Sequence, residues 1–285
     1  MTTIREAWRS GRAQLRESPS PALDARLLLE HVLGRDHAYL IAHDADEMAA
    51  ADLAAYLRLI ERAAAHEPIP YLIGHAPFLG LSYAVSHDVL IPRPETEQLV
   101  ESAIEWAKGR GAIRVVDVGT GSGCLAVSLA RHLPQATVYA VDLSNLALDV
   151  ARRNVARHAS DSVQLVCGDL LESFASGLDL VVANLPYVAE ADWPLVSVGV
   201  KSFEPVLALY GGADGLDLFR KLLPQAAERL SPDGLLLMEI GWQQGKAVSE
   251  LALAAFPRAS IEVRPDFGKL DRIVAVQNHT PDKTV

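Results

Sequence analysis

A glycine-rich segment carries the clearest chemical indication in this sequence. Asp117-Val-Gly-Thr-Gly-Ser-Gly123 follows an apolar run and precedes a helical pattern that begins at Cys124. Glycines at a strand-to-helix turn let the backbone turn tightly and approach a ligand, while the first helical turn offers free N–H groups. We therefore predict a ligand site at this loop.

The spacing of the glycines distinguishes between the known kinds of loop. The nicotinamide dinucleotide fingerprint requires a third glycine where this chain has Cys124, and the phosphate-binding loop requires a lysine that does not follow these glycines. The remaining pattern, D-x-G-x-G-x-G, resembles that of S-adenosylmethionine-dependent methyltransferases. S-adenosyl-L-methionine is therefore the predicted cofactor, and no metal site is predicted.

Two further carboxylates end the next two predicted strands. Asp142 stands where a carboxylate accepts both ribose hydroxyls of an adenosine, and Asp169 is suited to accept from the adenine amino group. An Asp after a strand more often caps a helix or turn, but three carboxylates at successive strand ends favour a nucleoside site. The predicted cofactor-binding residues are Asp117, Gly119, Thr120, Gly121, Ser122, Gly123, Asp142, Asp169, Leu170 and Asn184.

The tetrad Asn184-Leu185-Pro186-Tyr187 follows the fourth predicted strand, at the edge where open α/β sheets bind ligands. Read structurally, it is an Asn-initiated turn with a rigid proline and a packing tyrosine. It also resembles the [DNS]-P-P-[YFW] motif of methyltransferases that act on amino nitrogens with a planar neighbour, namely exocyclic base amines and glutamine amides. These four residues are the predicted catalytic residues.

Several other sequence motifs narrow the resemblance from methyltransferases in general to one family. Ile91–Glu97, Tyr71–Gly74, Glu204-Pro205 with Gly211–Leu216, and Glu239–Gly241 together resemble the protein-(glutamine-N5) methyltransferases of peptide chain release factors, the HemK/PrmC family. The resemblance runs from about residue 20 to Val276. Taken alone, Ile91–Glu97 indicates a helix start, with Pro94 in the first turn and acidic residues after it.

The resemblance implies the reaction and the partner. In this family the methyl acceptor is the glutamine of a Gly-Gly-Gln loop in class I release factors, and a helical N-terminal domain engages the factor. Asn184 Oδ1 and the Leu185 carbonyl would accept the two amide hydrogens, Tyr187 would pack on the planar amide and Pro186 would stiffen the loop. The chain departs from the family where Leu185 replaces the first proline.

Three other functions remain open from the sequence. An adenine-N6 nucleic-acid methyltransferase shares the tetrad, and a ribosomal-protein glutamine methyltransferase is a near relative of the leading interpretation. A protein that binds the cofactor without chemistry and acts through its helical domain is a third alternative, to which only Leu185 points.

The surrounding elements must place these residues at one edge of a sheet. Helices are expected at residues 22–33, 48–65, 95–108, 124–132, 146–158, 216–230 and 245–255, and strands at 71–73, 77–79, 83–85, 113–117, 137–141, 163–166, 178–183, 235–240, 260–263 and 272–276. Strands that alternate with helices predict an α/β fold: a doubly wound, Rossmann-like methyltransferase sheet ending in an antiparallel hairpin, after a small helical N-terminal domain.

The same pattern predicts four segments. Residues 1–70 form a helical domain that ends at the prolines of Glu67–Pro70, residues 71–93 a β-hairpin linker, residues 94–278 an α/β domain, and residues 279–285 a loose tail. The family resemblance implies that the first is the substrate-recognition domain and that residues 94–278 are the S-adenosylmethionine-dependent methyltransferase domain.

Composition limits the class of protein. The 285 residues carry a net charge of −10, which disfavours a protein that grips nucleic acid through phosphates. Two cysteines are too few for a disulfide framework, and neither a secretory signal nor a membrane-spanning run is found. We expect a cytoplasmic monomer with a protein substrate and no direct nucleic-acid partner.

Overall fold

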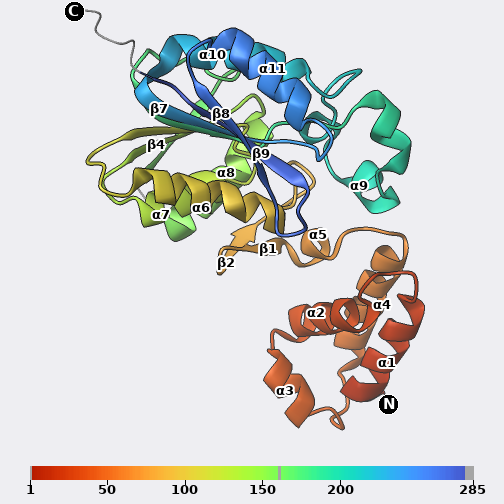
Figure 1. Ribbon diagram of the computed structural model, residues 1–285. Helices are drawn as coiled ribbons and strands as arrows, with labels where there is room; N and C mark the ends of the chain where they lie inside the picture. The colour runs from red at the N-terminus through yellow and green to blue at the C-terminus, as the bar shows by residue number, and fades with distance from the viewer. Residues whose placement is uncertain (1, 160–161, 280–285) are drawn as a thin grey trace, which may run out of the picture. The chain divides into compact units, whose positions relative to one another are not determined.

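The computed structural model describes residues 2–159 and 162–279, so the predicted tail beyond residue 279 lies outside it. The described chain divides into two compact units (Figure 1). Unit 1 consists of Met1–His75 and Ser197–Phe203, and unit 2 of Ala76–Val196 and Glu204–Val285. No helix in the described part of the chain is both long and apolar enough to cross a membrane.

Unit 1 is helical, as the N-terminal pattern predicts. Its helices are α1 (Ile4–Gln14), α2 (Pro21–Leu33), α3 (His37–Ala42), α4 (Ala50–Ala64), α5 (Ile69–Ile73) and α9 (Val198–Phe203). Helix α2 ends at Gly34 in the left-handed conformation, which glycine adopts without strain. At Gly11 of α1 a Cβ would lie 2.0 Å from Tyr56 Oη of α4, so the close approach of these helices requires glycine.

One predicted strand of this region is wrong. The structure places Tyr71–Ile73 in helix α5, which begins directly after Pro68. Pro70 occupies its first turn, where a missing N–H costs no helical hydrogen bond. Tyr71 and Leu72 are buried. The proline pair therefore starts helix α5, while α4 already ends at Ala64.

Unit 2 contains the predicted Rossmann-like sheet. Its strands are β3 (Arg114–Val118), β4 (Thr137–Asp142), β5 (Val163–Cys167), β6 (Leu178–Ala183), β7 (Leu230–Glu239), β8 (Ser260–Pro265) and β9 (Asp271–Gln277). Their order is β5-β4-β3-β6-β7-β9-β8. Pairing is parallel from β5 to β7, and β9 runs antiparallel to both of its neighbours, which confirms the predicted terminal hairpin.

Helices cover both faces of this sheet (Figure 1). One face carries α6 (Glu97–Ala107), α7 (Cys124–His132) and α8 (Asn145–His158), whose buried side chains share a core with inward residues of β3, β4 and β6. The other face carries α10 (Asp217–Arg229) and α11 (Gly245–Ala255). Short 3-10 helices lie at Pro94–Thr96, Glu190–Leu195 and Val206–Ala208. The first overlaps the start of the helix expected at residues 95–108, and the sequence pattern predicts no element at the other two.

A separate two-stranded sheet is formed by β1 (His75–Phe78) and β2 (Leu81–Ala84). Phe78 and Tyr83 are buried in the core that α6 and α7 share with the large sheet. Asn154 of α8 accepts a hydrogen bond from the Ala84 N–H (2.7 Å) and donates to the carbonyls of Ala84 and Ser122. These hydrogen bonds hold the β1–β2 hairpin against helix α8 and the Ser122 backbone of the glycine loop.

Candidate functional site

A cavity opens at the carboxyl ends of β3, β4, β5 and β6. The last residue of β4, Asp142, and the turns after the other three strands, with Gly119, Gly168 and Asn184, contribute to its wall. Because β3 is the point at which the strand order reverses, this is where doubly wound sheets bind their ligands. The other lining residues used below are Val89, Arg93, Thr96, Thr120, Gly121, Ser122, Val141, Leu143, Ser144, Asp169, Leu170, Leu185 and Pro186.

The glycine loop is held close to the strand beside it. The N–H groups of Gly119 and Thr120 both donate to the Val141 carbonyl, at 2.9 and 3.0 Å. Gly119 has φ +71°, and a Cβ there would stand 2.9 Å from Leu185 Cδ2. Any larger residue would be strained and would collide with the tetrad, so the loop and the tetrad are packed as one surface.

Asp117 supports this loop from beneath and is not among the lining residues. Its side chain is fully buried; Oδ2 accepts from Thr120 Oγ1 (2.5 Å) and from the Ala126 N–H (3.1 Å), and Oδ1 has no hydrogen-bond partner among the described residues. Burial raises the pKa of Asp117 to about 7. Gly123 also lies outside the cavity wall, where it begins α7.

Asp142 lines the cavity and organises the turns on both sides of it. Oδ2 accepts from the Gly121 N–H and Oδ1 from the Ser144 N–H, each at 2.9 Å. Partial burial raises the pKa of this carboxyl, while the backbone N–H groups oppose that shift. Since a carboxylate oxygen has two lone pairs, both oxygens keep an acceptor position for a ligand.

The turn after β5 forms the next part of the wall. Gly168, Asp169 and Leu170 all line the cavity, and Leu170 has φ +50°, a left-handed conformation that is uncommon for a residue with a side chain. Leu143 and Val89 add apolar surface to the cavity that Asp142 and Asp169 also line. Apolar walls together with carboxylates suit a nucleoside, whose base can pack on apolar side chains and whose hydroxyls and amino group can donate to acids.

The tetrad side chains join a buried polar network. Asn184 Nδ2 donates to Thr96 Oγ1 (3.0 Å), and Thr96 Oγ1 donates to Glu239 Oε2 (2.6 Å). The Tyr187 hydroxyl donates to Glu239 Oε1 (3.2 Å). Burial raises the pKa of both Glu239 and Tyr187. Tyr187 therefore lies behind the cavity wall, whereas Asn184, Leu185 and Pro186 line it.

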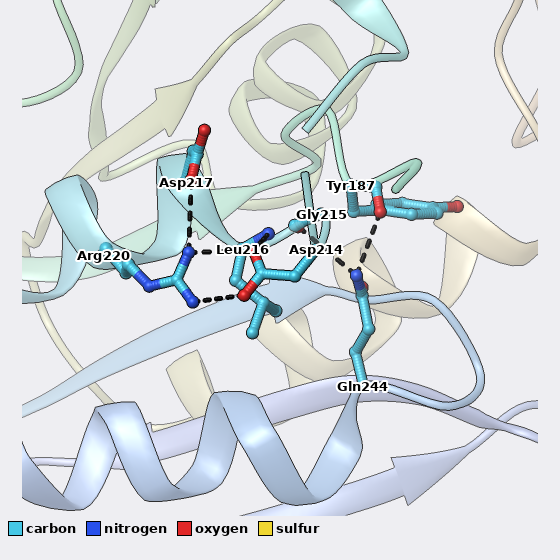
Figure 2. Close-up of polar contacts among 7 residues, drawn as sticks. All are labelled: Tyr187, Asp214, Gly215, Leu216, Asp217, Arg220 and Gln244. Carbon is cyan, nitrogen blue, oxygen red and sulfur yellow. Dashed lines mark hydrogen bonds and ion pairs between the residues drawn. The ribbon is translucent and has the colours of Figure 1, made fainter. Parts of the chain in front are cut away.

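The backbone of the tetrad is fixed by a side chain that follows β7. Figure 2 shows Gln244 Nε2 donating to the carbonyls of Tyr187 (3.0 Å) and Gly215 (3.3 Å). Gln244 Oε1 accepts from the Gly241 N–H (2.9 Å), so the amide cannot turn over without losing these contacts. In the same view Arg220 pairs with Asp214 and Asp217, which ties the loop before α10 to its first turn.

The segment before α6 contributes more than a helix start. Arg93 and Thr96 both line the cavity. Arg93 forms an ion pair with buried Glu204, whose other oxygen accepts from the Ile91 N–H (3.2 Å). Arg93, Thr96, Glu204 and Glu239 are not among the predicted site residues, although the blocks that carry the family resemblance contain all four. Those blocks were the only signal for them.

Comparison with known proteins identifies the family of both units. The model of the PrmC N-terminal domain matches residues 6–74, and that of the methyltransferase small domain matches residues 98–198. In Bordetella pertussis a release factor glutamine methyltransferase is 45% identical over 255 residues, which cover 89% of this chain and 93% of that protein. A protein of the same name from Koribacter versatilis is 40% identical, covering 98% and 99% of the two chains.

Solved structures share the fold. A ribosomal protein L11 methylase from Lactobacillus delbrueckii subsp. bulgaricus is 21% identical, with a TM-score of 0.51 over 72% of this chain and 90% of that one. A methyltransferase from Pyrococcus furiosus gives a TM-score of 0.52 at 19% identity, over 71% and 91% of the chains. At such identity they show only a common architecture. The identities to the Bordetella and Koribacter proteins, over nearly the whole length of each, place this chain in the release factor glutamine methyltransferase family.

Proposed function

We propose that this protein transfers a methyl group from S-adenosyl-L-methionine to the side-chain amide nitrogen, N5, of the glutamine in the Gly-Gly-Gln motif of class I peptide chain release factors. The observation that carries the proposal is the position of Asn184. Its carboxamide lines the cavity directly beside the glycine loop, with its nitrogen engaged by Thr96. We further propose that the enzyme acts as a cytoplasmic monomer.

The residues of the cavity fit the cofactor. Gly119 and Gly121 have positive φ, and a Cβ at Gly121 would meet no protein atom within 4 Å, so the loop leaves room for a ligand at its surface. Asp142, Asp169, Leu143 and Leu170 all line the cavity. We infer that Asp142 would accept from the ribose hydroxyls and Asp169 from the adenine amino group, and that the two leucines would pack on the base. When bound, S-adenosylmethionine supplies an electrophilic methyl group on a positively charged sulfur.

The chain's own groups would prepare the amide. An amide nitrogen is a poor nucleophile because its lone pair is delocalised into the carbonyl. Asn184 Oδ1 and the Leu185 carbonyl accept its two hydrogens, hold the nitrogen in line with the methyl group and stabilise the positive charge that develops as conjugation is lost. Tyr187 and Pro186 support the loop that carries these acceptors. As the nitrogen–methyl bond forms, the methyl–sulfur bond would break with its electron pair left on the sulfur. The methylated nitrogen would then lose one proton to water, so no strong base is required before transfer.

Methyl transfer to an intact release factor tests the proposed function. The purified protein is incubated with methyl-labelled cofactor and either a release factor, the same factor with its Gly-Gly-Gln glutamine replaced by alanine, or duplex DNA. We expect label only in the first reaction, at the glutamine side chain as located by mass spectrometry. Labelled adenine in the DNA reaction would instead identify a nucleic-acid enzyme.

Leu185→Pro is expected to leave methylation of the glutamine similar or higher. The acceptor at this position is a main-chain carbonyl, which proline also supplies. Proline at a compatible φ stabilises by about 0.4–1 kcal/mol, and the Leu185 N–H donates no hydrogen bond within the described chain. Lost packing of the buried Leu185 side chain against Gly119 opposes this gain and should appear in the thermal melt.

The measurement is methyl incorporation beside cofactor binding. A Leu185→Pro protein that folds and binds cofactor but transfers no methyl group would show that the loop geometry differs from the proposed one, and the acceptor assignment would fail with it.

We propose that unit 1 recognises the release factor. A variant lacking residues 1–74 should bind cofactor normally, while kcat/KM on an intact release factor falls at least about 10-fold, equivalent to about 1.4 kcal/mol of lost binding. The deletion stops before β1 because Phe78 and Tyr83 belong to the core of unit 2. A short peptide that contains Gly-Gly-Gln is the control and should be methylated equally by both proteins. Undiminished kcat/KM on the intact factor would exclude this role.

A further inference from the structure

Thr96 stands between a buried carboxylate and the proposed acceptor of the substrate amide. Its side chain is 3% exposed and that of Glu239 is 2% exposed, so water does not replace the contacts between them. Thr96 Oγ1 lies 2.6 Å from Glu239 Oε2 and 3.0 Å from Asn184 Nδ2. Three elements meet here: the 3-10 helix before α6, the end of β7 and the turn after β6.

Counting hydrogens determines the direction of each bond. Thr96 has a single hydroxyl hydrogen. Burial raises the pKa of Glu239, but the hydroxyls of Thr96 and Tyr187 and the charge of Arg272 oppose that shift and favour the ionised carboxylate, which accepts but does not donate. The hydroxyl hydrogen therefore points to Glu239, and its lone pair accepts from the Asn184 amide nitrogen. Because the Asn184 nitrogen is used in this way, the carboxamide oxygen is the atom that remains for the cavity. Tyr187 donates to the other oxygen of Glu239.

We propose that Glu239 is a positioning residue which, through the Thr96 hydroxyl, sets which end of the Asn184 carboxamide faces the substrate. This inference rests on the proposed function, in which Asn184 Oδ1 accepts from the glutamine amide. An asparagine presents either a donor or an acceptor to its neighbour. If the Asn184 nitrogen faced the substrate, its NH2 group would meet the NH2 group of the glutamine amide, and the substrate would be repelled rather than bound.

Glu239→Gln replaces one hydrogen-bond acceptor of the side chain with a donor, with almost no change of shape. Glutamine has one acceptor and one donor where the carboxylate has two acceptors. If its oxygen faces Thr96, its nitrogen faces Tyr187 and the tyrosine hydrogen loses its acceptor. If its oxygen faces Tyr187, its nitrogen donates to Thr96, and the Thr96 hydrogen then requires Asn184 Oδ1. The second arrangement pairs both hydroxyl hydrogens and turns the Asn184 NH2 group toward the substrate.

The test separates turnover from cofactor binding. With a release factor as substrate and saturating cofactor, we expect kcat of Glu239→Gln to fall at least about 10-fold, a smaller loss than the one of about 10² for deleting a transition-state hydrogen-bond partner outright, because Asn184 is still present. The cofactor Kd by calorimetry should stay within about threefold. Asp179→Asn is the matched carboxylate-to-amide control: Asp179 lies at the amino end of β6, where it accepts from the Arg114 N–H, and its change should leave kcat unaltered.

A second pair of variants keeps the proposal testable if Glu239→Gln does not fold. Thr96→Ser retains the hydroxyl and should keep kcat near that of the unaltered protein, whereas Thr96→Val lacks it and should lose kcat at least about 10-fold. Rescue by serine is not expected of a residue that only fills space.

The outcomes distinguish this inference from the proposed function. Unchanged kcat in Glu239→Gln or Thr96→Val, or equal losses of kcat and cofactor affinity, would overturn the positioning role. If Asn184→Ala greatly lowers turnover while Glu239→Gln does not, only the role of Glu239 is wrong. If Asn184→Ala itself leaves turnover intact, the acceptor assignment fails and the positioning role falls with it.

Discussion

Replacing Asn184 with alanine is expected to lower turnover on a release factor by at least about 10², the scale observed when one preorganised transition-state hydrogen-bond partner is removed. Asn184 lies at the cavity wall with its nitrogen held by Thr96, so its oxygen is the acceptor that the substitution deletes. The effect falls on kcat because the charge on the amide nitrogen grows only as transfer proceeds.

The decisive measurement compares kcat with cofactor affinity. Calorimetry should give a cofactor Kd for Asn184→Ala close to that of the unaltered protein. Asn278→Ala is the matched control, since Asn278 donates to the Ser231 carbonyl away from the cavity. Equal losses of turnover and cofactor affinity would make Asn184 mainly a cofactor residue instead.

Asp142→Ala is expected to weaken binding of S-adenosylmethionine by about 1.5–3 kcal/mol through the loss of charge-assisted hydrogen bonds. The structure supplies a second contribution to this loss. The same carboxylate accepts from the N–H groups of Gly121 and Ser144, so alanine also leaves the glycine loop and the start of α8 without a common anchor.

Asp142→Asn separates the two contributions. Its amide keeps one acceptor for the backbone or the ribose but loses the charge and the second acceptor, so its affinity should lie between those of the aspartate and alanine proteins. Calorimetric titration with the cofactor gives the comparison, and circular dichroism checks the fold. A near-normal Kd for a folded Asp142→Ala protein would remove Asp142 from the cofactor site.

Local patterns in the sequence were sufficient for most of unit 2. Helix Cys124–His132 and strand Leu178–Ala183 were predicted to the residue, because burial, glycine turns and apolar runs act over a few positions. The prediction failed at Tyr71–Ile73, where a short apolar run reads equally as strand or helix and Pro70 decides in favour of a first helical turn.

The chemistry of the site was predicted in part from single positions. The glycine loop, Asp142, Asp169 and Asn184 follow strands of one parallel sheet, and that topology alone requires them to meet at the same edge. The roles assigned to them as cofactor and substrate contacts stay predictions. Asp117 and Tyr187 also belong to this set in the sequence, yet the structure places them behind the cavity wall.

The sequence by itself therefore determined the class of fold, the strand edge that holds the site and the family, because each depends on local periodicity or on contiguous motifs. Only the tertiary structure decided that Thr96 and Glu239, 143 positions apart, share a hydrogen bond, and that Asn184 donates to the same Thr96 hydroxyl. Contacts between distant segments depend on how helices pack on a sheet and on which buried polar groups find partners there. The spacing of residues along one strand or helix predicts neither the packing of helices on the sheet nor the partners of buried polar groups.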